Sequence, residues 1–77
     1  TSTLVDVRIL LKEALLASAT GILLCHNHPS ASLKPSLADL SITAKVKKAS
    51  ELMDIKLLDH LIITEDAYFS FADEGKL

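Results

Sequence analysis

Two histidines that stand two positions apart, His26 and His28, follow a short apolar run, and an aspartate, Asp39, comes soon after them. The run at 22–25 is typical of a buried strand, and strand side chains alternate between faces, so both imidazoles would lie on one face. Pro29 ends the strand because it has no N–H for the ladder. Asp39 would begin the next helix, where its carboxylate could reach back to the strand end. The spacing predicts that His26, His28 and Asp39 bind one metal ion, which we expect to be zinc.

This set of ligands predicts a particular chemistry. Two neutral imidazoles and one carboxylate leave the fourth tetrahedral position of a zinc ion to water, as in catalytic rather than structural sites. Zinc lowers the pKa of such a water to about 7 and polarises a carbonyl group. Hydrolysis of an amide bond fits these properties.

Two simpler interpretations stay open on the residues alone. A His-x-His pair by itself occurs more often as surface or core histidines than as a metal site. Ser36 and Asp39 also fit the S-x-x-D pattern of a capping box, in which hydroxyl and carboxylate only close a helix N-terminus.

The elements that would position these residues can be read from hydrophobic periodicity. Asp6 is expected to cap a helix at 6–19, with an apolar row facing the core. The strand at 22–25 and a loop at 30–35 follow. A second helix at 36–54 should turn the row Ile42, Val46, Ala49 and Met53 inward. Segments 55–64 and 67–71, rich in β-forming residues, predict a hairpin. The order α-β-α-β-β indicates an α/β or α+β class.

Length, charge and cysteine content narrow the class of protein. The 77 residues allow one domain, 1–77. A net charge of −2, with Lys45, Lys47 and Lys48 read as a solvated helix face, disfavours nucleic acid as a partner. The lone Cys25 favours the cytoplasm, and no apolar run approaches the ~20 residues of a membrane span.

The string CHNHPSASLKPSLAD, residues 25–39, resembles the JAMM signature: His-x-His-Pro, a short loop, then Ser-x-x-Asp. The segments VRILLKEAL, IKLLDHLIIT and SFADEGKL extend the resemblance to the RadC family of bacterial proteins, over essentially the full chain. It implies a small JAB1/MPN-like (cytidine-deaminase-like) three-layer sandwich. It also implies that His26, His28 and Asp39 are zinc ligands and that the catalytic Ser36 hydroxyl binds water or the tetrahedral intermediate.

In this family the general base is a glutamate on a strand well before the histidine pair, and no residue of this sequence stands there. Glu13 falls within the first predicted helix, beside Lys12, where we expect it to face solvent. We therefore expect this sequence to be the C-terminal part of the domain, truncated before the glutamate. Ala31 also departs from the family, which usually has glycine after the HNHPS motif.

Three further features receive structural interpretations. His60, which follows Asp59 in the family's Asp-His pair, is expected to be a buried, hydrogen-bonded histidine rather than a fourth ligand. Cys25 is expected to pack on the strand face opposite the histidines. The aromatic residues of the last segment, Tyr68, Phe69 and Phe71, are expected in the core rather than in base stacking.

The favoured function is a zinc-dependent peptidase or isopeptidase with a peptide or protein substrate. The alternative is a non-catalytic MPN-like module that contacts other proteins, with a homodimer compatible with either. The DNA-repair role traditionally attached to the RadC name finds no support in the charge of the sequence.

Overall fold

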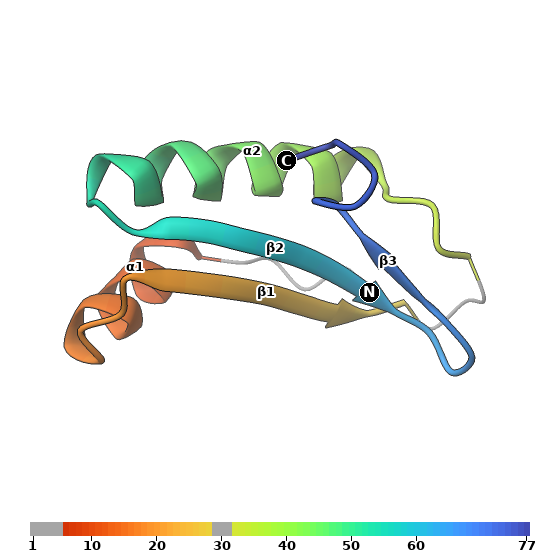
Figure 1. The fold of residues 1–77 in the computed structure, drawn as a ribbon, viewed down its shortest axis with the longest axis horizontal. Helices are drawn as coiled ribbons and strands as arrows, with labels where there is room; N and C mark the ends of the chain where they lie inside the picture. Colours follow the sequence, from red (N-terminus) through yellow and green to blue (C-terminus); the bar gives the residue numbers. More distant parts are fainter. Residues whose placement is uncertain (1–5, 29–31) are drawn as a thin grey trace.

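The computed structural model describes residues 6–28 and 32–77. Its elements, in chain order, are α1 (Val7–Leu16), β1 (Gly21–Asn27), α2 (Leu37–Leu52), β2 (Lys56–Ile63) and β3 (Tyr68–Ser70) (Figure 1). This order and the mixed α/β class confirm the prediction from the sequence. Among the described residues, no helix is both long and apolar enough to cross a membrane.

The strands form one mixed sheet in the order β1-β2-β3. β1 and β2 are parallel and are joined through α2, whereas β2 and β3 form the predicted antiparallel hairpin. Figure 1 shows α2 running along β2, and α1 contacts α2. The described elements thus make a helical layer over a sheet. A third layer, which the family resemblance implied, is not formed by these residues.

Helix α1 ends at Leu16, earlier than the predicted residue 19, because Ser18 adopts a left-handed conformation with φ 53°. The N–H of Ser18 donates to the carbonyl of Leu15, and that of Ala19 donates to the carbonyl of Ala14. These two bonds form a Schellman motif, the usual end of a helix at a left-handed residue.

We expect Ser18→Gly to raise the free energy of unfolding by about 0.5–1 kcal/mol, since glycine adopts positive φ without the steric cost that serine carries. Ser18 is exposed, so no packing is lost. Urea denaturation of the intact protein measures the change. Ala17→Gly is the matched control: Ala17 has φ −83°, so its replacement should lower stability by a similar amount. Equal effects of the two variants would contradict the argument.

The inward face of α2 differs from the predicted apolar row. Val46 is fully buried, but Met53 at the end of that row is 45% exposed. The buried line instead contains the polar residues Asp39, Thr43 and Ser50. Polar groups can be buried where they are hydrogen-bonded, and each of these three side chains has such a partner. The core accordingly combines apolar packing, centred on Val46, Ile62 and Phe71, with a polar network.

The sheet face turned away from α2 is open in the described structure. Leu23 is 57% exposed and Cys25 is also exposed, so the fully buried strand and the packed cysteine predicted from the sequence are both wrong here. Tyr68, predicted in the core, is 62% exposed, whereas Phe71 is buried as predicted. Side chains alternate between the two faces of β1, where Ile22, Leu24 and His26 are partly buried and Leu23 and Cys25 lie on the open face.

Asp59 joins the end of β3 to β2. Its carboxylate accepts hydrogen bonds from the Ser70 hydroxyl and from the backbone N–H groups of His60 and Ala72. Burial alone would raise the pKa of Asp59, but these hydrogen bonds outweigh burial and lower it. The side chains of Asp59 and His60 therefore project from opposite faces of β2, as strand alternation predicted.

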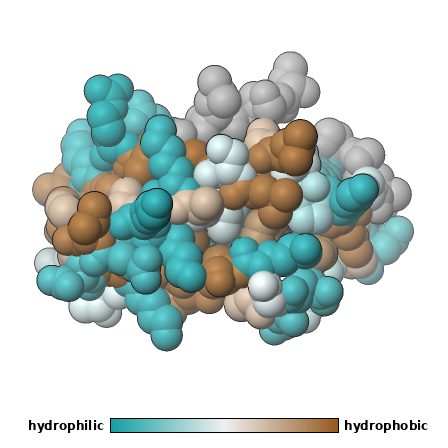
Figure 2. All heavy atoms as spheres, turned by 90° about the horizontal axis from the view of Figure 1, so that it is seen from above, coloured by the Kyte–Doolittle hydropathy of each residue, from teal (hydrophilic) through white to brown (hydrophobic). Residues whose placement is uncertain are grey.

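Figure 2 shows the molecule from above, from the side of α2 in Figure 1. Hydrophilic and hydrophobic side chains are mixed across this face. Lys45 and Lys48 are exposed on α2, in agreement with a solvated helix face, while Lys47 is only partly exposed.

Candidate metal centre

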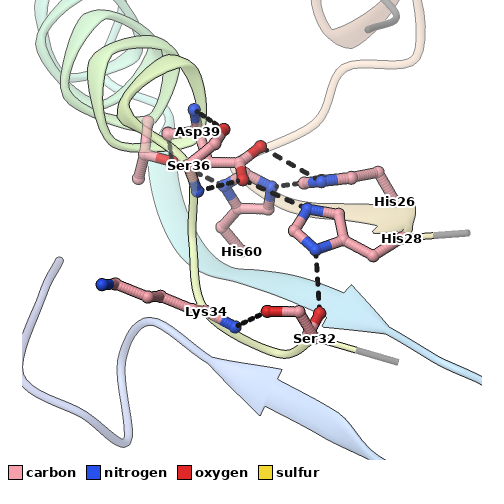
Figure 3. A network of polar contacts seen from close by, with 8 residues as sticks. His26, His28, Ser32, Lys34, Ser36, Asp39 and His60 are labelled. Carbon is pink, nitrogen blue, oxygen red and sulfur yellow. Dashed lines mark hydrogen bonds and ion pairs between the residues drawn. The ribbon is translucent and has the colours of Figure 1, made fainter. Parts of the chain in front are cut away.

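The end of β1 and the first turn of α2 bring His26, His28 and Asp39 together, as the spacing predicted (Figure 3). One potential ligand atom from each residue lies within 4.8 Å of the others. The Nε2 atom of His26 is 3.1 Å from Asp39 Oδ1, and the Nε2 atom of His28 is 3.2 Å from Asp39 Oδ2. Both rings therefore point their outer nitrogen at one carboxylate.

Asp39 is held in place by the N-terminus of α2. Ser36 is the N-cap: its Oγ accepts from the Asp39 N–H at 3.1 Å, and its own N–H donates to Asp39 Oδ2 at 2.7 Å. The capping box is thus present, but it uses only one carboxylate oxygen and leaves Oδ1 toward His26. The capping and ligand interpretations are compatible with each other.

The charge of Asp39 suits a cation. Burial acts to raise the pKa of Asp39, but the hydrogen bonds from Ser36, together with the neighbouring His26 and His28, outweigh burial and lower it. The positive end of the α2 dipole acts in the same direction. Asp39 is therefore an anion at neutral pH.

The proton of His28 can be placed from its contacts. The Nδ1 atom lies 3.1 Å from the backbone carbonyl oxygen of Ser32. A carbonyl oxygen only accepts, so Nδ1 carries the hydrogen and neutral His28 has its lone pair on Nε2. In the neutral ring that lone pair faces an anionic carboxylate oxygen, and a metal cation bound between the two would satisfy both. Two imidazoles and a carboxylate are a common zinc set, so the residues present fit the metal.

His60 is a buried residue that contacts the candidate metal site through His26. It is 3% exposed, its Nε2 lies 2.9 Å from Nδ1 of His26, and its Nδ1 bonds to the hydroxyl of Thr43. Its ring stacks on Phe71, with centroids 4.6 Å apart and planes 6° from parallel. Burial, followed by the neighbouring His26, lowers the pKa of His60 and favours the neutral ring. His60 is buried and hydrogen-bonded, as predicted.

The sequence interpretation did not foresee that His60 contacts His26 or that Thr43 takes part. The spacing held a partial signal for Thr43, which stands four residues after Asp39 and therefore on the same helix face. The pairing of β1 with β2, which brings His60 beside Leu24, could not be read from the spacing.

Other residues singled out in the sequence lie outside the cluster. Glu13 is exposed on α1, in agreement with its predicted solvent-facing position. Cys25 lies on the opposite face of β1 from the histidines. Ala31 falls outside the described residues.

Comparison with known proteins places these observations in a family. The chain is 60% identical over 73 residues to the UPF0758 protein of Flavobacterium johnsoniae, covering 95% of this chain and 32% of that protein. It is 50% identical over 76 residues to the UPF0758 protein of Porphyromonas gingivalis, covering 97% and 34%, respectively. The match to the Aquifex aeolicus UPF0758 protein is also 50%, over 68 residues, covering 88% and 29%.

The chain therefore spans about a third of the length of these curated relatives. Residues 1–76 match the profile of the RadC-like JAB domain. By this match and by its relatives, the chain belongs to the RadC-like JAB domain family.

Proposed function

We propose that the intact protein is a zinc-dependent metallohydrolase of the JAMM type that cleaves amide bonds, as a peptidase or isopeptidase. The observation that carries this proposal is the convergence of His26, His28 and Asp39, whose potential ligand atoms lie within 4.8 Å of one another. A zinc ion bound there would supply an acidified water and a Lewis acid for the substrate carbonyl.

The exposure of the three side chains supports a site that a substrate can reach. The side chain of His26 is 34% exposed, that of His28 is 17% exposed and that of Asp39 is 12% exposed. Structural zinc sites surround the metal with four protein ligands, whereas this cluster offers three from the part of the chain that the structure describes, and His26 is the most exposed of them. A fourth position taken by water favours catalysis over a purely structural ion.

Ser36 is the residue best placed to contact a substrate oxygen. Its hydroxyl oxygen accepts from the Asp39 N–H, and its hydroxyl proton, which also bonds to the Asp39 carboxylate, can turn toward a substrate oxygen. Ser36 is exposed and stands directly before α2, beside the carboxylate. We assign it the stabilisation of negative charge on the attacked carbonyl oxygen.

A hydrolase of this kind also needs a group that accepts the proton of the attacking water. Glu13 is exposed on α1, and we assign it no role. The chain spans about a third of its relatives, and the family resemblance puts the proton-accepting glutamate on a preceding strand. We propose that the intact protein supplies it there.

The open position can be tested without a known substrate. We expect a hydroxamate, a bidentate metal-binding probe, to change the visible absorption spectrum of the Co²⁺-substituted intact protein, since a free coordination position admits an outside ligand. As a control, the same titration is repeated on Asp39→Asn, where no specific Co²⁺ spectrum should form. A Co²⁺ spectrum that hydroxamate leaves unchanged would overturn the hydrolase proposal and favour the non-catalytic module.

A further inference from the structure

A buried row of polar atoms leads from the candidate metal site into the core. The hydroxyl of Thr43 donates to the backbone carbonyl of Asp39 at 2.6 Å and also contacts Nδ1 of His60. Nε2 of His60 then lies 2.9 Å from Nδ1 of His26. Figure 3 shows the contact between His60 and His26. Thr43 and His60 are each only 3% exposed, so these atoms satisfy one another rather than bonding to bulk water.

The number of protons in this row decides which nitrogen of each histidine carries hydrogen. Thr43 has one hydroxyl proton, and it is used on the carbonyl of Asp39. Thr43 must therefore accept from His60, which places the hydrogen of neutral His60 on Nδ1. Nε2 of His60 is then an acceptor and takes the Nδ1 hydrogen of His26. Neutral His26 is left with its lone pair on Nε2, the atom 3.1 Å from Asp39 Oδ1.

The opposite direction is disfavoured by one distance. If the Thr43 hydroxyl donated to His60, its oxygen and the carbonyl oxygen of Asp39 would stand 2.6 Å apart with no hydrogen between them. Two oxygen lone pairs repel at that separation. The short contact within α2 therefore sets the direction of the whole row.

We propose that Thr43 and His60 are positioning residues that hold His26 in its Nδ1–H tautomer and so keep Nε2 free to bind a divalent metal ion. This inference deepens the proposed function and rests on its metal site. The partners of a metal-bound histidine fix its tautomer and ring orientation, and their loss typically weakens metal binding.

The first test reads the tautomer directly, in metal-free intact protein. Two-bond ¹H–¹⁵N correlation spectra at about pH 8, where unperturbed imidazoles are neutral, distinguish the two tautomers. We expect the Nδ1–H form of His26 in the wild type and in Thr43→Ser, which keeps the hydroxyl. In the near-isosteric Thr43→Val, Nδ1 of His60 loses its hydrogen-bond acceptor. The ring can then form a hydrogen bond only by carrying its hydrogen on Nε2 and donating it to Nδ1 of His26. His26 should then change to the Nε2–H form.

The second test measures Zn²⁺ affinity by competition with a chromophoric chelator. We expect about 10–100-fold weaker binding for Thr43→Val and wild-type affinity for Thr43→Ser. His60→Phe keeps a ring against Phe71 but removes both nitrogens, and it should weaken binding at least as much. Because both residues act along one row, Thr43→Val should add no further loss in the His60→Phe background. Additive losses would instead indicate two independent packing defects and would overturn the inference.

The two proposals can fail separately. Wild-type protein in which His26 is the Nε2–H tautomer would overturn the positioning role even if zinc binds. Wild-type protein that binds no zinc would overturn the proposed function, while the tautomers of the wild type and of Thr43→Val would still decide the role of the row.

Discussion

Asp39→Asn in the intact protein is expected to reduce bound zinc from about one ion per chain to less than about 0.2, since the variant replaces a charged ligand with a neutral amide. The substitution separates the two roles of Asp39. An amide can replace the carboxylate at the N3 position of a capping box, and the asparagine oxygen can still accept from the Ser36 N–H at the α2 N-terminus. A residue that only capped the helix would therefore leave the zinc content unchanged. Elemental analysis of protein purified from a zinc-supplied culture measures it.

Asp66→Asn is the matched control for this experiment. Asp66 lies in the exposed turn between β2 and β3, and the same change of charge there should leave zinc near one ion per chain. His28→Ala should lose zinc like Asp39→Asn, because it removes a second of the three ligands. Zinc retained at the wild-type level in Asp39→Asn would show that the carboxylate is not a ligand.

Phe71→Ala should lower the free energy of unfolding by about 3–5 kcal/mol, as expected for removal of a fully buried phenylalanine that leaves a cavity. Phe71 has no exposed surface, stacks on His60 and meets Phe69 edge-on at a centroid distance of 5.4 Å. A loss of this size is large for a small core. Thermal and urea denaturation of the intact protein measure the change.

Tyr68→Ala is the matched aromatic control. Tyr68 lies in β3, shortly before Phe71 in the chain, but it is 62% exposed. Its replacement should lower the free energy of unfolding by less than about 1 kcal/mol. Similar losses for the two variants would contradict the assignment of Phe71 to the core. A loss confined to Phe71→Ala, accompanied by weaker zinc binding, would also connect the stacking under His60 with the candidate metal site.

Local patterns in the sequence were sufficient to predict the elements and the convergence of three side chains. Hydrophobic periodicity predicted two helices, a strand and a hairpin in the order observed. The alternation of a strand placed His26 and His28 on one face, and the capping pattern placed Asp39 at the start of a helix. These are short-range relationships, so residues within a few positions of one another decide them.

Local patterns failed where the answer depended on what lies across the fold. The inward line of α2 contains Asp39 and Thr43 rather than Met53, because tertiary hydrogen bonds satisfy the polar groups that periodicity would leave outside. Likewise Cys25 and Tyr68 are exposed, because alternation turns them to the sheet face that no described element covers. Periodicity identifies two faces of an element but does not say which neighbour covers each.

The sequence alone therefore determined the element order, the family resemblance and the candidate ligands His26, His28 and Asp39, because each is encoded by residue type and short spacing. Only the tertiary structure revealed that His60 supports His26 and that Thr43 sets the direction of their hydrogen bonds. His60 reaches the site through the parallel pairing of β1 with β2, a contact between segments distant in the chain. Such pairing is decided by packing of the whole domain, which no local pattern records.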